Sequence, residues 1–300
     1  MRHLPNNTNI AVLSLLFISV IWGVHFAILK IMLETLPPLW MTALRYGGAA
    51  LLLAVVLNRR LRTIDRPMLA GSLPMLLFLV AGILIQAVGL QFTAAGNASF
   101  ILSTYVVLTP FVAYFFGKKL LGANIWVALV TLFGLFLFSY DPSSTLTKGD
   151  AMMLAVSVFW ALHITFLGQV VQKHDPLIIG FLQVAAACVC SLAGALLLEE
   201  LPPLAAATPR LLWSLLYSVV LATALGFIIQ PWAQKYVAAA PAAVLMMSQS
   251  VFGAVAGWVM LNEMFSTRQY IGAAVILLSI GASILINTRH AAKKPAAAEN

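Results

Sequence analysis

The octapeptide SVIWGVHF at residues 19–26 decides the predicted fold, because it returns in altered form as SVFWALHI at residues 157–164. The two copies lie 138 residues apart and keep Ser, Val, Trp and His at matching places, inside long apolar runs. A Trp and a His three residues apart on a helix share one face. Trp22 with His25, and Trp160 with His163, therefore mark the faces where we expect specific chemistry.

The composition excludes an ordinary soluble domain. Of 300 residues, 62% are hydrophobic and 9% are charged, whereas about a quarter of a soluble chain is charged. The apolar residues fall in runs of about 20, the length of a helix that crosses a bilayer. Ten runs are predicted to span: 9–32, 37–57, 70–91, 96–117, 123–140, 150–170, 176–198, 211–234, 240–261 and 268–287. The predicted fold class is an all-α polytopic membrane protein with ten transmembrane helices.

The net charge of +8 is interpreted as a topology signal, with a lipid bilayer and not a nucleic acid as the partner. If the N-terminus is cytosolic, twelve Lys and Arg residues fall inside and four outside, and the positive-inside rule favours that orientation. The inside set is Arg2, Arg59, Arg60, Arg62, Arg66, Lys118, Lys119, Lys173, Lys235, Arg289, Lys293 and Lys294, and the outside set is Lys30, Lys148, Arg210 and Arg268. We expect a multi-pass inner-membrane protein with both termini cytoplasmic.

The repeat extends over nearly the whole chain. The Pro38-Leu39 pair matches Pro176-Leu177 at the same offset, and Gln86 matches Gln230 after the offset has grown to 144. The predicted organisation is a cytosolic N-terminus (1–8), a first repeat (9–140), a second repeat (148–288) and a cytosolic tail (289–300). Five spans in each half is an odd number, so the second half must enter the membrane from the other side. Such inverted repeats are typical of secondary transporters, with the substrate site between the halves near the midplane.

Several short motifs carry a resemblance to a known family. They are Trp22-Gly23, Leu44-Arg45-Tyr46, the stretch AAGNA at 94–98, and VFGA at 251–254. In this order, with ten spans, they resemble the EamA-type transporters of the drug/metabolite transporter superfamily. The resemblance implies a ten-helix inner-membrane carrier that exports amino acids or related metabolites by alternating access.

Arg45 is the ionisable residue that lies deep in a predicted span, about eight residues from its start. A charge at that depth is costly, and a functional role is the default hypothesis. Its guanidinium could bind a substrate carboxylate through two hydrogen bonds, or it could reach the outer headgroups. The tryptophans could stack on substrate or belong to an interfacial belt, and the histidines could bind substrate or be satisfied within the helices. The predicted substrate-binding residues are Trp22, His25, Arg45, Gln86, Tyr105, Trp160, His163, Gln230 and Gln249.

The nine acidic residues all fall in predicted loops or helix ends, so no carboxylate is expected near the midplane for proton coupling. Any coupled proton is then expected on His25 or His163. No phosphate-binding loop, metal-ligand spacing or nucleophile motif is present, so neither a cofactor nor an enzyme activity is predicted. The function predicted first is export of small metabolites, most of all amino acids, and the alternative is export of flat aromatic cations. The sequence leaves the oligomeric state open, and a monomer is compatible with it.

Overall fold

The computed structural model of the protein describes residues 5–117, 122–139, 147–203, 208–261, 264 and 266–292. Every regular element in these residues is helical, which confirms the predicted class. The first half contains α1 (Pro5–Leu33), α2 (Pro38–Leu61), α3 (Arg66–Gly89), η1 (Leu90–Phe92), α4 (Ala95–Leu102), α5 (Tyr105–Phe115) and α6 (Gly122–Ser139). The second half contains α7 (Lys148–Val170), α8 (Pro176–Leu198), α9 (Pro209–Tyr217), η3 (Ser218–Leu225), α10 (Gly226–Gln234), α11 (Ala239–Met246), α12 (Gln249–Leu261) and α13 (Thr267–Ala292).

Eight helical segments of the described residues are long and apolar enough to cross a membrane. The fifth predicted run, 123–140, is α6, whose apolar part Ile125–Leu137 is shorter. The tenth predicted run lies within α13, which continues to Ala292 and so enters the predicted tail. The protein is thus a multi-pass membrane protein, and the count of ten inverted spans remains a prediction.

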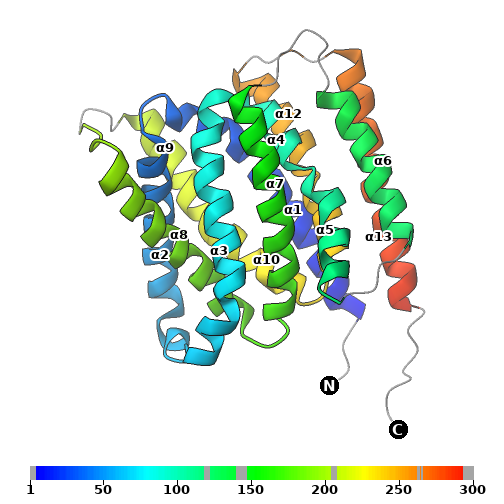
Figure 1. Ribbon diagram of the computed structural model, residues 1–300, viewed down its shortest axis with the longest axis horizontal. Coiled ribbons are helices and arrows are strands. Elements are labelled where there is room, and N and C mark those ends of the chain that lie inside the picture. The colour runs from blue at the N-terminus through cyan, green and yellow to red at the C-terminus, as the bar shows by residue number, and fades with distance from the viewer. Residues whose placement is uncertain are drawn as a thin grey trace.

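The helices pair across the two halves of the chain. Helix α2 packs along α8, α3 along α7, and α6 along α13, and α1 contacts α12 and α10. Figure 1 shows α6 and α13 side by side at one edge of the bundle, with the remaining helices grouped beside them. Because each pair joins one helix from each half, the space between the halves lies at the centre of the structure.

Two spans are interrupted at equivalent places. Helices α4 and α5 are separated at residues 103–104, and α11 and α12 are separated at 247–248, which is 144 residues later. At both breaks the backbone turns tightly, with the Thr104 amide donating to the Ile101 carbonyl and the Ser248 amide to the Leu245 carbonyl. Such i→i+3 bonds shift the following residues relative to a continuous α-helix. Pro110 lies inside α5 and Pro231 inside α10, so neither proline ends its helix.

A third irregular segment is η3, an eight-residue π-helix between α9 and α10. Helix α1 binds its start through two hydrogen bonds: the Tyr217 hydroxyl donates to the Ile21 carbonyl at 2.9 Å, and His25 Nε2 lies 3.1 Å from Ser218 Oγ. A π-helical turn is rare and appears often at functional sites. The segment bearing the first octapeptide is therefore attached to the least regular part of the second half.

The acidic side chains of the described residues lie at helix ends. Glu199, at the end of α8, accepts from the Leu39 and Trp40 amides at 2.9 Å each and so caps the first turn of α2. At the opposite end of the same helix pair, Asp175 caps α8 and pairs with Arg60 at 2.8 Å. Three further acidic residues, Asp141, Glu263 and Glu299, lie outside the described residues.

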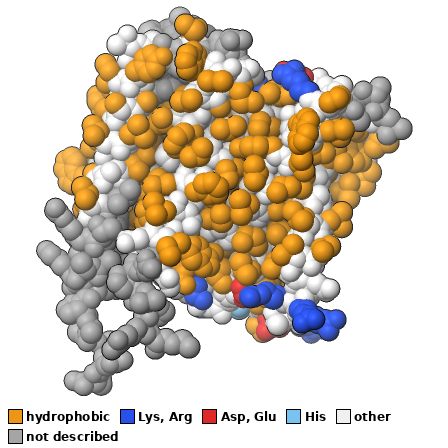
Figure 2. Space-filling view, turned by 180° about the vertical axis from the view of Figure 1, so that it is seen from behind, with side chains coloured by type: hydrophobic (Ala, Val, Ile, Leu, Met, Phe, Trp, Pro, Cys, Tyr) orange, Lys and Arg blue, Asp and Glu red, His pale blue; other side chains and the backbone are white. Residues whose placement is uncertain are grey.

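The surface agrees with a bilayer-spanning bundle. In the space-filling view, apolar side chains cover the middle of the molecule, while the charged ones gather at its ends (Figure 2). Exposed apolar residues include Leu51, Val55, Trp126, Leu197 and Trp213, each more than two-thirds exposed. Lipid tails are the solvent that such a surface fits.

Candidate functional site

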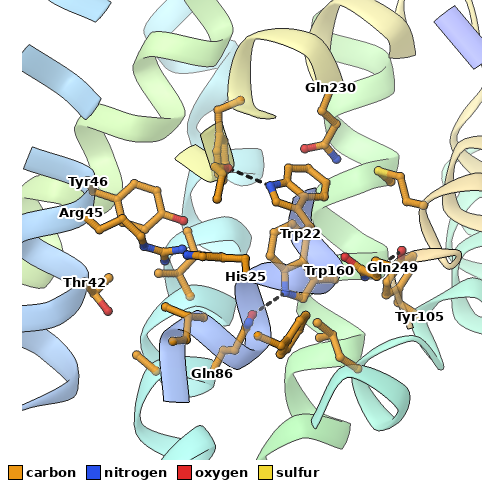
Figure 3. Close-up of a pocket in the computed structure, with 18 of the residues that line it drawn as sticks. Trp22, His25, Thr42, Arg45, Tyr46, Gln86, Tyr105, Trp160, Gln230 and Gln249 are labelled. Carbon is orange, nitrogen blue, oxygen red and sulfur yellow. Dashed lines mark hydrogen bonds between the residues drawn. The ribbon is translucent and has the colours of Figure 1, made fainter. Parts of the chain in front are cut away.

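A cavity lies at the centre of the bundle, between the two halves (Figure 3). The cavity has a volume of about 60 Å³. Eight of the nine predicted site residues line it, namely Trp22, His25, Arg45, Gln86, Tyr105, Trp160, Gln230 and Gln249. These residues come from α1, α2, α3, α5, α7, α10 and α12, so the site is assembled from both halves.

Arg45 carries the permanent charge of the cavity. Its Nε is buried without a hydrogen-bond partner, and its guanidinium carbon lies 4.4 Å from the centre of the Tyr46 ring. No acidic side chain of the described residues forms an ion pair with it. The guanidinium faces the cavity beside His25 (Figure 3). It therefore does not extend to the lipid headgroups, which was the alternative position considered from the sequence. An unpaired cation is thus held inside the membrane-spanning part of the protein.

The two repeated tryptophans bind different partners. Trp22 donates from Nε1 to the Ala222 carbonyl in η3 at 2.8 Å, while Trp160 donates to Gln86 Oε1 at 3.3 Å. Gly226 makes room for the first indole, because a Cβ there would lie 2.7 Å from Trp22 Nε1. Both rings line the central cavity rather than an interfacial belt.

The two repeated histidines are not equivalent in space. His25 lines the cavity and contacts η3, whereas His163 lies outside the lining, fully buried, with its Nε2 2.7 Å from Gln183 Oε1. Gln183 occupies the place that Arg45 has in the first half. A glutamine side chain offers the histidine a hydrogen-bond acceptor, and an arginine side chain does not. His163 therefore bonds to Gln183 on the neighbouring helix, whereas His25 bonds to Ser218.

Equivalent residues of the broken spans meet in the cavity. Tyr105 begins α5 and Gln249 begins α12, 144 residues later, and Gln249 Nε2 lies 3.5 Å from the Tyr105 hydroxyl. Nearby, the hydroxyls of Ser103 and Ser250 share a hydrogen bond that joins the same two spans. Gln230 also faces the cavity, but neither its Nε2 nor its Oε1 has a partner.

Sequence reasoning missed several lining residues. Thr42 and Tyr46 lie on α2, three residues before Arg45 and one residue after it, and Phe227 follows η3. The spacing could have identified Thr42, because residues three or four apart share a helix face, and Tyr46 lies four residues from Thr42. No comparable signal existed for Ala222, which lines the cavity through a π-helical segment.

Comparison with known proteins agrees with this architecture. The chain matches the EamA-like transporter family twice, over residues 9–140 and 147–285. It is 28% identical to an uncharacterized transporter of Archaeoglobus fulgidus over 279 residues, which cover 89% of this chain and 83% of that protein. It is 24% identical to the uncharacterized transporter YoaV of Bacillus subtilis, covering 89% and 94% of the two chains.

A solved crystal structure of another protein superposes with a TM-score of 0.76, covering 94% of this chain and 99% of that one. At 15% sequence identity this likeness shows a shared fold and nothing finer. The helical bundle and the two family matches, which together span most of the sequence, lead to one conclusion: the chain belongs to the EamA-like transporter family.

Proposed function

We propose that the protein is a secondary transporter that exports small carboxylate-bearing metabolites, most of all amino acids, across the inner membrane by alternating access. The observation that carries this proposal is Arg45, a cation in the central cavity with no acidic partner among the described residues. A buried charge without a partner is unfavourable. A carboxylate entering the cavity would supply that partner through a charge-assisted, two-pronged pair.

The rest of the lining supports a small solute with an apolar body. Trp22, Trp160 and Phe227 present aromatic surface, while Tyr105 and Gln249 present polar groups at the breaks of their spans. A site at the meeting of two halves, bordered by interrupted helices, is the arrangement that alternating access uses. We further propose that α6 and α13 complete the ten spans of two inverted halves, with the Arg60 end of the bundle in the cytosol.

Export of flat aromatic cations is the second candidate. The indoles of Trp22 and Trp160 favour it, because tryptophan is the side chain that attracts cations best through its ring face. The positive charge of Arg45 in the same cavity opposes it. The charge makes the carboxylate proposal the better supported of the two.

The experiment is counterflow in proteoliposomes, with a labelled amino acid and an aromatic cation as alternative solutes. Arg45→Ala is the test variant, and Arg59→Ala is its matched control, since Arg59 is an exposed arginine near the end of the same helix. We expect Arg45→Ala to lose amino-acid exchange and Arg59→Ala to keep it. Cation exchange that is equal in wild type and Arg45→Ala, without amino-acid exchange in either, would replace the first candidate by the second.

The proposed orientation is tested separately. Single cysteines placed near Arg60 and near Arg210, at opposite ends of the bundle, are exposed to a membrane-impermeant thiol reagent in intact cells. We expect labelling beside Arg210 and protection beside Arg60, and the reverse pattern would invert the proposed topology.

A further inference from the structure

Gln230 is the polar group of the cavity whose hydrogen-bonding capacity is wholly unused. Its side chain is completely buried, it lines the cavity, and neither Nε2 nor Oε1 has a partner. Figure 3 shows the amide pointing into the cavity above the Trp22 indole. Leaving a buried donor or acceptor unsatisfied is unfavourable, so an amide held in this position calls for a ligand group.

The contrast with Gln86 shows why Gln230 is free. The two glutamines match in the internal repeat, as do the two indoles beside them. Trp160 Nε1 of the second half donates to Gln86 Oε1 of the first half. Trp22 of the first half does not bind the matching Gln230 but donates to the Ala222 carbonyl, which the π-helical segment of the second half presents to it. The indole that could have satisfied Gln230 is therefore engaged elsewhere.

The chemistry of the free amide selects the ligand group. A primary amide offers two N–H donors and one carbonyl acceptor. An ammonium group can satisfy only the Oε1 acceptor, and a carboxylate can satisfy only the Nε2 donors. A carboxamide satisfies both atoms at once, through a planar pair of N–H···O bonds. The apolar end of an aliphatic substrate would leave both atoms unpaired.

We propose that Gln230 is a specificity-determining residue that binds the carboxamide end of the transported substrate, while Arg45 binds its carboxylate. This inference rests on the proposed function and narrows it, from small carboxylates in general to those that carry a carboxamide. A site built to hydrogen-bond a polar group discriminates strongly against an analogue that lacks the group.

The test measures how well two unlabelled amino acids of similar length compete with the counterflow of the labelled amino acid. Glutamine ends in a carboxamide, and norleucine has an apolar end. Full-length protein is used as wild type, as Gln230→Met and as Gln169→Met. Gln169 is the matched control, because its Nε2 is also buried without a partner but the residue does not line the cavity. Methionine removes the amide at either position and keeps an unbranched side chain of similar length.

We expect the wild type to prefer glutamine over norleucine by about tenfold or more. In Gln230→Met the preference should fall to about one or below, because glutamine loses its partner and norleucine no longer leaves a buried amide unpaired, and in Gln169→Met the preference should persist. Norleucine competition also shows that each variant is folded and active. A wild type without preference, or a Gln230→Met variant that keeps it, overturns the inference and leaves carboxylate transport standing. If neither amino acid competes in the wild type, the proposed function fails and the inference fails with it.

Discussion

Replacing Gly23 by alanine tests a close backbone contact between two helices from opposite halves of the chain. Helix α1 approaches α12 at this residue, and a Cβ on Gly23 would lie 2.5 Å from the Gln249 carbonyl oxygen, 2.7 Å from Phe252 Cβ and 2.8 Å from the Gly253 amide nitrogen. Non-bonded heavy atoms ordinarily lie about 3.5 Å or more apart. Two of the three atoms belong to the backbone, so no change of rotamer relieves the overlap and the helices must separate by about 1 Å.

The expected magnitude combines two opposing effects. Alanine in place of glycine stabilises an unhindered helix by about 1 kcal/mol. Overpacking a tight contact costs typically 1–3 kcal/mol, and contact with backbone places this site at the upper end. We therefore expect Gly23→Ala to lower the free energy of unfolding by about 2 kcal/mol. Because Gln249 begins α12, the same displacement should also reduce transport.

The assay is thermal unfolding of the purified variants in one detergent. Gly281→Ala is the control, because no atom lies within 4 Å of a Cβ at that position of α13. The equivalent of Gly23 in the second repeat is Ala161, which is fully buried, so Ala161→Gly should cost about 2 kcal/mol, half from helix propensity and half from the lost buried methyl group. An unfolding midpoint of Gly23→Ala equal to that of Gly281→Ala would refute the close approach of α1 and α12.

Three further changes each remove one hydrogen-bonding side chain. Trp22→Phe should reduce stability by about 1–3 kcal/mol, because it leaves the Ala222 carbonyl of η3 without its donor; hydrogen exchange of η3 should rise with it, and unchanged exchange would argue against the bond. Glu199→Ala should cost about 1–2 kcal/mol by uncapping α2, measured by unfolding and contradicted by an unaltered midpoint. Thr93→Val should cost about 1–3 kcal/mol because the hydroxyl donates to buried Asp150 at 2.5 Å; an equally stable variant would show that solvent or another group replaces it.

Most of the architecture could be predicted from the sequence. The apolar runs predicted helices because a helix satisfies its own backbone within lipid, and hydropathy is a property of neighbouring residues. The recurrence of the octapeptide predicted that helices from both halves would meet at one site. Trp22, His25 and Trp160 lie together in the central cavity in agreement with that expectation, although their role in binding remains a prediction.

Other features depended on contacts that local patterns do not contain. The breaks of two spans fall at 103–104 and 247–248, where the sequence contains no proline or glycine to mark them. His163 matched His25 in the repeat, yet it lies outside the cavity and is bound to Gln183. The substitution of an arginine by a glutamine on the adjacent helix accounts for that difference.

The sequence by itself determined that this chain is a duplicated helical membrane protein, because length, hydropathy and internal repetition depend only on the order of the residues. Tertiary structure alone decided which of the two repeated glutamines, Gln86 or Gln230, accepts a hydrogen bond from an indole. Trp22 bonds to Ala222, 200 residues away, and Trp160 bonds to Gln86, so one glutamine of the repeated pair is used and Gln230 is not. The physical reason is that a hydrogen bond between helices depends on where packing places each acceptor. In the second half, the π-helical segment places the Ala222 carbonyl beside the Trp22 indole.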